Sequence, residues 1–138
     1  MRSLLRAVLR GDNDRKVEIV PTRRVIRAFL AVEAATFIVA ALVHAGILTN
    51  ADPHAAAATG ESVIAVALLI GLALTWVGLT SVATIGILAQ GFALFGTLVG
   101  ILTIIAGVGP QSIADIAYHV AISVVLLVGV VVASRRLA

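Results

Sequence analysis

The sequence contains no cysteine, and this absence excludes disulfide bonds, thiolate metal sites and iron–sulfur ligation. Charge is also scarce: only 12% of the 138 residues are Asp, Glu, Lys or Arg, whereas soluble proteins contain about 25%. Hydrophobic residues make up 61% of the chain. This composition predicts an integral membrane protein whose principal partner is the lipid bilayer.

Lys and Arg are missing from the middle of the chain. All ten lie in residues 2–27 or at Arg135 and Arg136. The pI near 10.6 could indicate nucleic-acid binding. However, basic residues confined to the two ends of an apolar chain are typical of membrane topology. We therefore expect no nucleic-acid partner.

Four long apolar runs fill most of the chain, and each is long enough to cross a bilayer. The second and third runs are almost continuous, but together they are about twice the length that a bilayer needs, so they must form a hairpin. We predict an all-α protein, a four-transmembrane-helix bundle with spans at about 24–48, 59–79, 82–108 and 112–134. The predicted domains are a basic N-terminal segment, residues 1–22, and the transmembrane domain, residues 23–138.

The N-terminal segment begins with residues that could form a short amphipathic helix. In residues 1–10, the leucines and the valine share one helical face and three arginines lie elsewhere. This pattern predicts a helix on an anionic cytoplasmic leaflet, with a frayed basic tail as the alternative. Gly-Asp-Asn-Asp at residues 11–14 is expected to end it. Because the loops between the spans contain no Lys or Arg, both termini are predicted to be cytoplasmic, in a bacterial inner membrane.

Small residues recur at helical spacing in the second and third spans. Ala67, Gly71 and Thr75 form one such ridge, and Gly96 and Gly100 form a GxxxG pair. Small residues let the backbones of two membrane helices approach closely. The spacing does not distinguish packing within one chain from packing between chains, so a homo-oligomer or a larger membrane complex stays open.

Ionisable residues inside the spans define an outer polar level. Asp115 and His119 are four residues apart and share one face of the fourth span. His44 and Glu61 fall at a similar outer depth when counted from the span ends. Imidazole and carboxylate ligands suit zinc, copper or iron, so these four residues are the predicted metal ligands. The alternative is a set of salt bridges and hydrogen bonds between helices that only fixes their packing.

Haem offers a second version of this site. His44 and His119 could be axial ligands of a haem b between the first and fourth helices. Their apparent depth difference of about 7 Å, at 1.5 Å per residue, counts against this version unless the helices tilt. His54 lies in the outer loop beside Pro53 and is expected to be a solvated loop residue.

Glu33 and Gln90 define an inner polar level. Glu33 lies on the same helical stripe as His44 but roughly 16 Å away along the axis. Gln90 in the third span falls near the depth of Glu33. Intramembrane carboxyl groups often mark proton or ion paths, so the second hypothesis is a proton-coupled small transporter or ion path that uses Glu33 and Gln90. The third hypothesis is a structural accessory subunit of a membrane complex.

Signals for catalysis are weak. The serines do not lie in a Gly-x-Ser-x-Gly elbow, and the glycines lie within apolar helices rather than in a phosphate-binding loop. Asp115 and His119, adjacent on one helix, cannot by themselves form a catalytic triad. The sequence therefore leaves open whether the protein is an enzyme and assigns no catalytic residue.

Several segments resemble known membrane proteins. Residues 27–33, 43–46 and 89–94, with Asp115-x-x-Tyr118-His119, resemble a group of uncharacterised bacterial four-span integral membrane proteins. This resemblance covers most of residues 24–134 and implies the four-span fold without implying an activity.

Two narrower resemblances concern single residues. Asp115 and His119 are similar to a metal-ligand pair in the copper-binding membrane subunit of particulate methane monooxygenase. A further His of that family corresponds to Val132 here, so the oxygenase activity is not carried over. Glu33 is similar in kind to the essential Glu in the first span of small multidrug transporters. The position of Trp76 in the second span and the 4% aromatic content depart from their cation-binding chamber.

Overall fold

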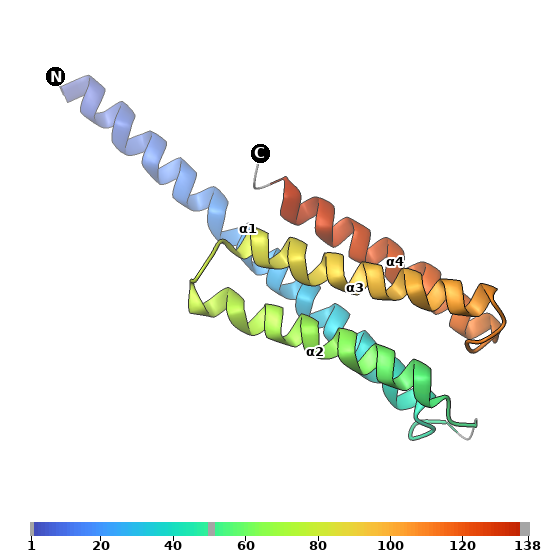
Figure 1. Ribbon diagram of the computed structural model, residues 1–138. Coiled ribbons are helices and arrows are strands. Elements are labelled where there is room, and N and C mark those ends of the chain that lie inside the picture. Colours follow the sequence, from blue (N-terminus) through green and yellow to red (C-terminus); the bar gives the residue numbers. More distant parts are fainter. Residues whose placement is uncertain (1, 50–51, 136–138) are drawn as a thin grey trace.

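The computed structural model describes the backbone of residues 2–49 and 52–135, and the side chains of residues 22–49 and 52–135. Within these ranges it has four helices and no strand (Figure 1): α1 (Arg2–His44), α2 (Ala55–Val77), α3 (Val82–Ile105) and α4 (Ile113–Ser134). Each helix contains a segment long and apolar enough to cross a membrane, which in α1 is Thr22–His44. The predicted fold class is confirmed, and the chain is a small multi-pass membrane protein.

The helix ends differ from the predicted ends by a few residues, and local capping explains the differences. α1 ends at His44 rather than near residue 48, because Gly46 adopts a left-handed conformation with φ +71°. α2 begins at Ala55 rather than near residue 59, because the His54 side chain accepts a hydrogen bond from the Ala57 amide at 3.2 Å. The predicted hairpin between the second and third spans is confirmed at residues 78–81.

The expected helix end at residues 11–14 is wrong, because the backbone of α1 is helical without interruption from Arg2. One glycine costs a helix only about 1 kcal/mol, which flanking residues can offset. The side chains of residues 1–10, on which the predicted amphipathic face depends, lie outside the described residues.

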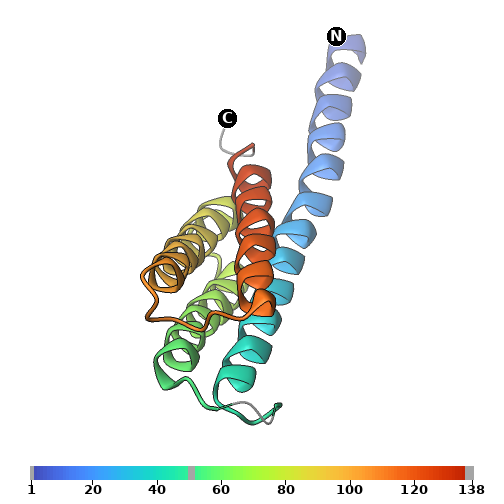
Figure 2. The ribbon, with the colours of Figure 1, turned by 90° about the vertical axis from the view of Figure 1, so that its right-hand side faces the viewer.

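The helices pack in sequence order around the bundle. α1 lies along α2, α2 along α3, and α3 along α4, while α1 also contacts α3 and α4 (Figures 1 and 2). Short loops between consecutive helices favour this antiparallel arrangement. α2 and α4 are diagonal and do not pack against each other. A group that connects them must therefore come from α1 or α3.

Small residues allow α2 and α3 to approach closely. A Cβ atom added at Gly71 would lie 2.6 Å from the Ala89 Cβ, and one added at Gly96 would lie 2.8 Å from Ile64 Cδ1. These two glycines of the predicted ridges therefore pack within the chain. Gly100 faces another partner, since an added Cβ would lie 2.9 Å from His119 Nε2.

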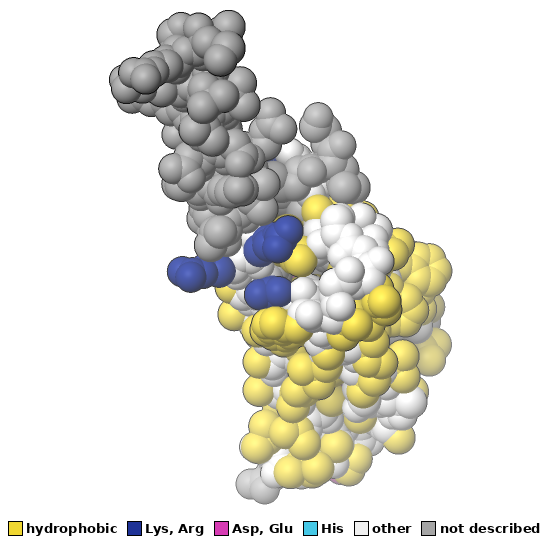
Figure 3. All heavy atoms as spheres, turned by 90° about the vertical axis from the view of Figure 1, so that its left-hand side faces the viewer, with side chains coloured by type: hydrophobic (Ala, Val, Ile, Leu, Met, Phe, Trp, Pro, Cys, Tyr) yellow, Lys and Arg dark blue, Asp and Glu magenta, His cyan; other side chains and the backbone are white. Residues whose placement is uncertain are grey.

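Exposed hydrophobic side chains occur on all four helices, and hydrophobic side chains cover much of the face seen in Figure 3. The basic side chains visible in this view gather at one end of that surface. We call the opposite end, where the α1–α2 and α3–α4 loops lie, the outer end, after the predicted topology. The side of the membrane that each end faces stays a prediction.

Arg27 joins α1 to the last turn of α2. Its guanidinium donates to the Thr75 hydroxyl at 2.9 Å and to the Thr75 carbonyl at 2.7 Å, and lies 4.7 Å from the centre of the Trp76 ring. A cation here satisfies a carbonyl at the helix C-terminus, where the helix dipole also favours positive charge.

We expect Arg27→Ala to lower the free energy of unfolding by about 1–2 kcal/mol, because a charge-assisted hydrogen bond and a cation–π contact are lost. Trp76 is the only tryptophan, so its emission should also shift. Chemical unfolding in detergent, followed by tryptophan fluorescence, measures both effects. Arg24→Ala is the matched control, since Arg24 is exposed on the same helix. Equal behaviour of the two variants would show that the Arg27 contacts contribute nothing.

Candidate functional site

His44 lies between two carboxyl groups at the outer end. Its Nδ1 is 2.7 Å from Glu61 Oε2, and its Nε2 is 2.9 Å from Asp115 Oδ1. We call these three residues the outer triad. Imidazole donates from both nitrogens only when it is protonated, so one proton beyond the neutral ring must reside on the triad. Because His44 comes from α1, the triad connects α2 and α4, which do not pack against each other.

Asp115 is held in place by the start of α4. Ser112 Oγ accepts from the Asp115 amide at 3.1 Å and also bonds to Asp115 Oδ2, which accepts from the Ser112 amide at 3.3 Å. This capping box leaves Asp115 Oδ1 for His44, and the helix N-terminus favours the negative charge of Asp115. Since Ser112 is exposed, a hydrogen-bonded chain runs from the outer surface through Asp115 and His44 to Glu61.

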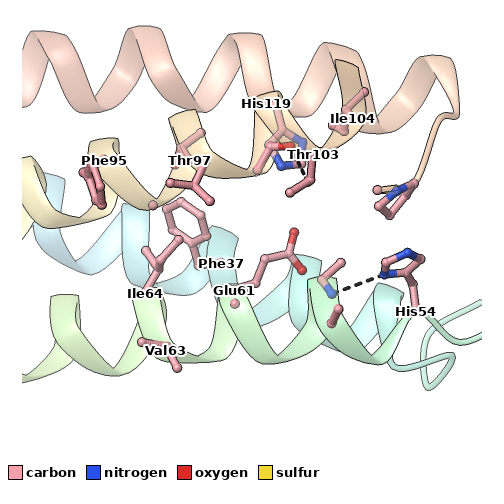
Figure 4. Close-up of a pocket in the computed structure, with 18 of the residues that line it drawn as sticks. Phe37, His54, Glu61, Val63, Ile64, Phe95, Thr97, Thr103, Ile104 and His119 are labelled. Atoms are coloured by element: carbon pink, nitrogen blue, oxygen red, sulfur yellow. Dashed lines mark hydrogen bonds between the residues drawn. The ribbon is translucent and has the colours of Figure 1, made fainter. Parts of the chain in front are cut away.

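A cavity of about 410 Å³ lies beside the triad, between the outer halves of α2 and α3 (Figure 4). Three phenylalanines line it, at positions 37, 92 and 95. Phe95 is 67% exposed, so the cavity opens between the two helices toward the lipid-facing surface. A cavity of this size and apolar character is typical of a small-molecule site.

Glu61 from α2 and His119 from α4 line this cavity together with three other polar residues, His54, Thr97 and Thr103 (Figure 4). Within the described part of the chain, Glu61 Oε1 is buried and has no hydrogen-bond partner. His119 from α4 donates from Nδ1 to the Asp115 carbonyl at 2.8 Å, so in the neutral ring Nε2 is an acceptor. Glu61 Oε1 and His119 Nε2 are therefore hydrogen-bond acceptors for which the described residues supply no donor.

His54 closes the outer end of the cavity. Its Nδ1 caps α2, and its Nε2 donates to the Val108 carbonyl at 3.3 Å. His54 was expected to be solvated, but the structure gives it a bonded role between two loops. Sequence reasoning had no signal for this role, because the contact joins loops that are 54 residues apart.

Glu33 and Gln90 meet at the inner level, as predicted, and both are fully buried. They meet beside Gly129 of α4, which sequence reasoning missed. A Cβ added at Gly129 would clash with Gln90 Oε1 and would lie 3.0 Å from Glu33 Oε1. The glycine therefore leaves the space that both side chains occupy.

The predicted metal ligands are only partly brought together. His44, Glu61 and Asp115 meet directly, whereas His119 bonds to the Asp115 backbone and faces the cavity. Both ring nitrogens of His44 are engaged with carboxyl groups. Among the residues that the structure describes, no group of three or more His, Asp or Glu side chains is arranged to hold a metal ion. Binding of a metal ion or haem stays a prediction.

Comparison of the chain with protein-family models, with curated proteins and with solved structures finds no match. The geometry of the polar groups and of the cavity therefore carries the functional argument alone.

Proposed function

We propose that this membrane protein is a proton-coupled carrier of a small amphipathic amine, which binds as an ammonium ion in the cavity between α2 and α3. The observation that carries the proposal is the position of the Glu61 carboxyl group. Glu61 lines the cavity, and its Oε1 is buried without a hydrogen-bond partner among the described residues, while its Oε2 belongs to the hydrogen-bonded chain that reaches the outer surface.

The chemistry of the ligand follows from the cavity wall. Glu61 Oε1 and His119 Nε2 are acceptors, so a ligand that donates N–H bonds satisfies them and an anionic ligand does not. The phenylalanines bind an apolar body and interact favourably with a cation. The opening toward lipid suits a molecule that partitions into the bilayer before it binds.

The outer triad supplies the coupling to protons. When no amine is bound, protonated His44 supplies the positive charge beside Glu61. A bound ammonium group supplies this charge instead. One proton then leaves His44 through Asp115 and Ser112 to the outer aqueous phase, and it returns when the amine departs. The predicted topology, with the arginine-rich end in the cytoplasm, places this exchange on the outer face of the membrane.

Calorimetric titration of the protein in lipid nanodiscs with 2-phenylethylamine tests this proposal. We expect binding with release of about one proton, measured from the heat in two buffers of different ionisation enthalpy. Glu61→Gln should weaken binding about tenfold or more, because a charge-assisted hydrogen bond is lost. Ser62→Ala, at the exposed neighbouring position, is the matched control. Tight binding of uncharged 2-phenylethanol, or unchanged binding by Glu61→Gln, would rule out the carrier as described.

A metal site is the second candidate, because His44, Glu61 and Asp115 gather at one point. Zinc, copper or iron would require His44 to turn one nitrogen away from a carboxyl group. Elemental analysis and an absorbance spectrum of the purified protein decide this candidate. Stoichiometric metal or haem that is lost in His44→Ala and kept in His54→Ala would support it. A protein that binds neither metal nor amine would point to the structural accessory subunit instead.

A further inference from the structure

The inner polar level contains acceptor atoms without donors. Both carboxyl oxygens of Glu33 and the Oε1 atom of Gln90 are buried and have no hydrogen-bond partner in the described part of the chain. Unpaired buried acceptors are costly, and a buried ionised carboxylate without a partner is more costly still. These oxygens therefore require a hydrogen-bond donor or a cation.

The orientation of the Gln90 amide is fixed by its other end. Its Nε2 donates to the Gly86 carbonyl, one helical turn earlier, at 2.9 Å. The carbonyl oxygen therefore points away from Gly86, toward Gly129 and Glu33. Exchanging the two ends of the amide would place two oxygens against each other at Gly86, so the amide cannot act as the donor to Glu33.

Among the described side chains, none forms an ion pair or a hydrogen bond with the Glu33 carboxyl group. α3 contains no titratable side chain, and those of α4 (Asp115, Tyr118 and His119) lie in its first two turns, far along the helix from Gly129. On α2 the titratable residue is Glu61, at the outer level. On the described part of α1, the nearest cation to Glu33 is Arg27, which is engaged with Thr75.

We propose that Glu33 and Gln90 form a proton-binding site in which Glu33 is protonated and its O–H donates a hydrogen bond to Gln90 Oε1, in the space left by Gly129. The hydrogen bond gives the Gln90 amide oxygen a donor, and the proton neutralises the Glu33 carboxylate. A sodium or potassium ion fits less well, because hard metal ions require about six oxygen ligands. Only three unpaired side-chain oxygens meet here, and the Gly86 carbonyl is already bonded to Gln90.

The site couples protonation to the packing of three helices. Glu33, Gln90 and Gly129 come from α1, α3 and α4, and all three must be in place for the hydrogen bond to form. Loss of the proton leaves a buried carboxylate facing an amide oxygen, so α4 must move to admit water. This site stands independently of the amine carrier, because it uses neither the cavity nor the outer triad. Together with the outer triad, the Glu33–Gln90 pair gives the protein two separate proton-binding sites.

Infrared difference spectroscopy at neutral pH tests the proton directly. The parent should show the C=O stretching band of a protonated carboxylic acid, shifted in D₂O, and Glu33→Gln should lose it. Gln90→Leu should keep the band but shift it toward a free carboxylic acid. Glu61→Gln is the matched control and should keep the Glu33 band. Absence of the band from the parent, or its persistence in Glu33→Gln, would overturn the proposal.

Thermal unfolding gives a second measurement that does not depend on the spectrum. Glu33→Gln should unfold within about 2 °C of the parent, because its amide N–H replaces the carboxylic O–H as donor to Gln90. Glu33→Leu should unfold at a clearly lower temperature, because Gln90 Oε1 then stays unpaired. Stabilisation of the parent, but not of Glu33→Gln, by sodium over choline at constant ionic strength would identify a metal ion in place of the proton.

Discussion

Replacing His44 with alanine is expected to lower the free energy of unfolding by about 3–5 kcal/mol, the largest loss that we expect from one substitution. The imidazole lies between Glu61 and Asp115, and its removal leaves Glu61 without a partner and Asp115 with only its bonds to Ser112. Glu61 is buried and cannot turn toward water without disturbing α2. Chemical unfolding in detergent, followed by the fluorescence of Trp76, measures the loss.

The control for this prediction removes the charges as well as the imidazole. In the His44→Ala background, Glu61→Gln and Asp115→Asn together should restore part of the lost stability, because buried amides cost less than buried unpaired carboxylates. Glu61→Gln alone in the parent should be destabilising, since the ion pair with His44 is lost. Additive effects of the three substitutions would show that the triad is not an energetic unit.

The fold was predictable because the thickness of a bilayer sets the length of an apolar run, and that length can be counted in the sequence. A helix that crosses the hydrocarbon needs about 20 apolar residues, and four such runs leave room for only short loops. The ends of the helices were less predictable, because they depend on local hydrogen bonds. The capping role of the His54 side chain moves the start of α2, and a histidine is not among the residues that commonly cap helices.

The candidate site was predictable in part, for a related reason. Depth in the membrane can be counted along each span, so His44, Glu61 and Asp115 were correctly grouped at one level. The rotation of each helix about its axis cannot be counted in the same way. Consequently the sequence did not show that His119 faces a cavity, or that Gly100 leaves the room for its ring.

Asp115 shows how one residue can be interpreted too narrowly from its sequence context. Its position within an apolar run groups it with the ionisable residues inside the spans. The structure places it in the first turn of α4, where Ser112 and Asp115 form a capping box and the helix N-terminus favours its charge. The Ser-x-x-Asp spacing before an apolar run was the available signal. Its location lowers the cost of Asp115 and leaves its second oxygen free to bond to His44.

Substitution of Gly129 is expected to cause the second large loss of stability. We expect Gly129→Val to lower the free energy of unfolding by about 3 kcal/mol, the upper end of the usual cost of overpacking. Even a single added carbon would clash with Oε1 of Gln90, which is fully buried. Its bond to Gly86 would break, or α4 would separate from α1 and α3.

Two further variants show whether the cost arises at this contact. Gly91→Val is the matched control on α3, because an added Cβ there meets no atom within 4 Å. It should change stability by less than about 1 kcal/mol, the scale of intrinsic helix propensity. Gln90→Ala combined with Gly129→Val should recover much of the loss, because the smaller side chain vacates the space that valine fills. If the double variant is as unstable as the sum of the single variants, the clash lies elsewhere and the placement of Gln90 against Gly129 is incorrect.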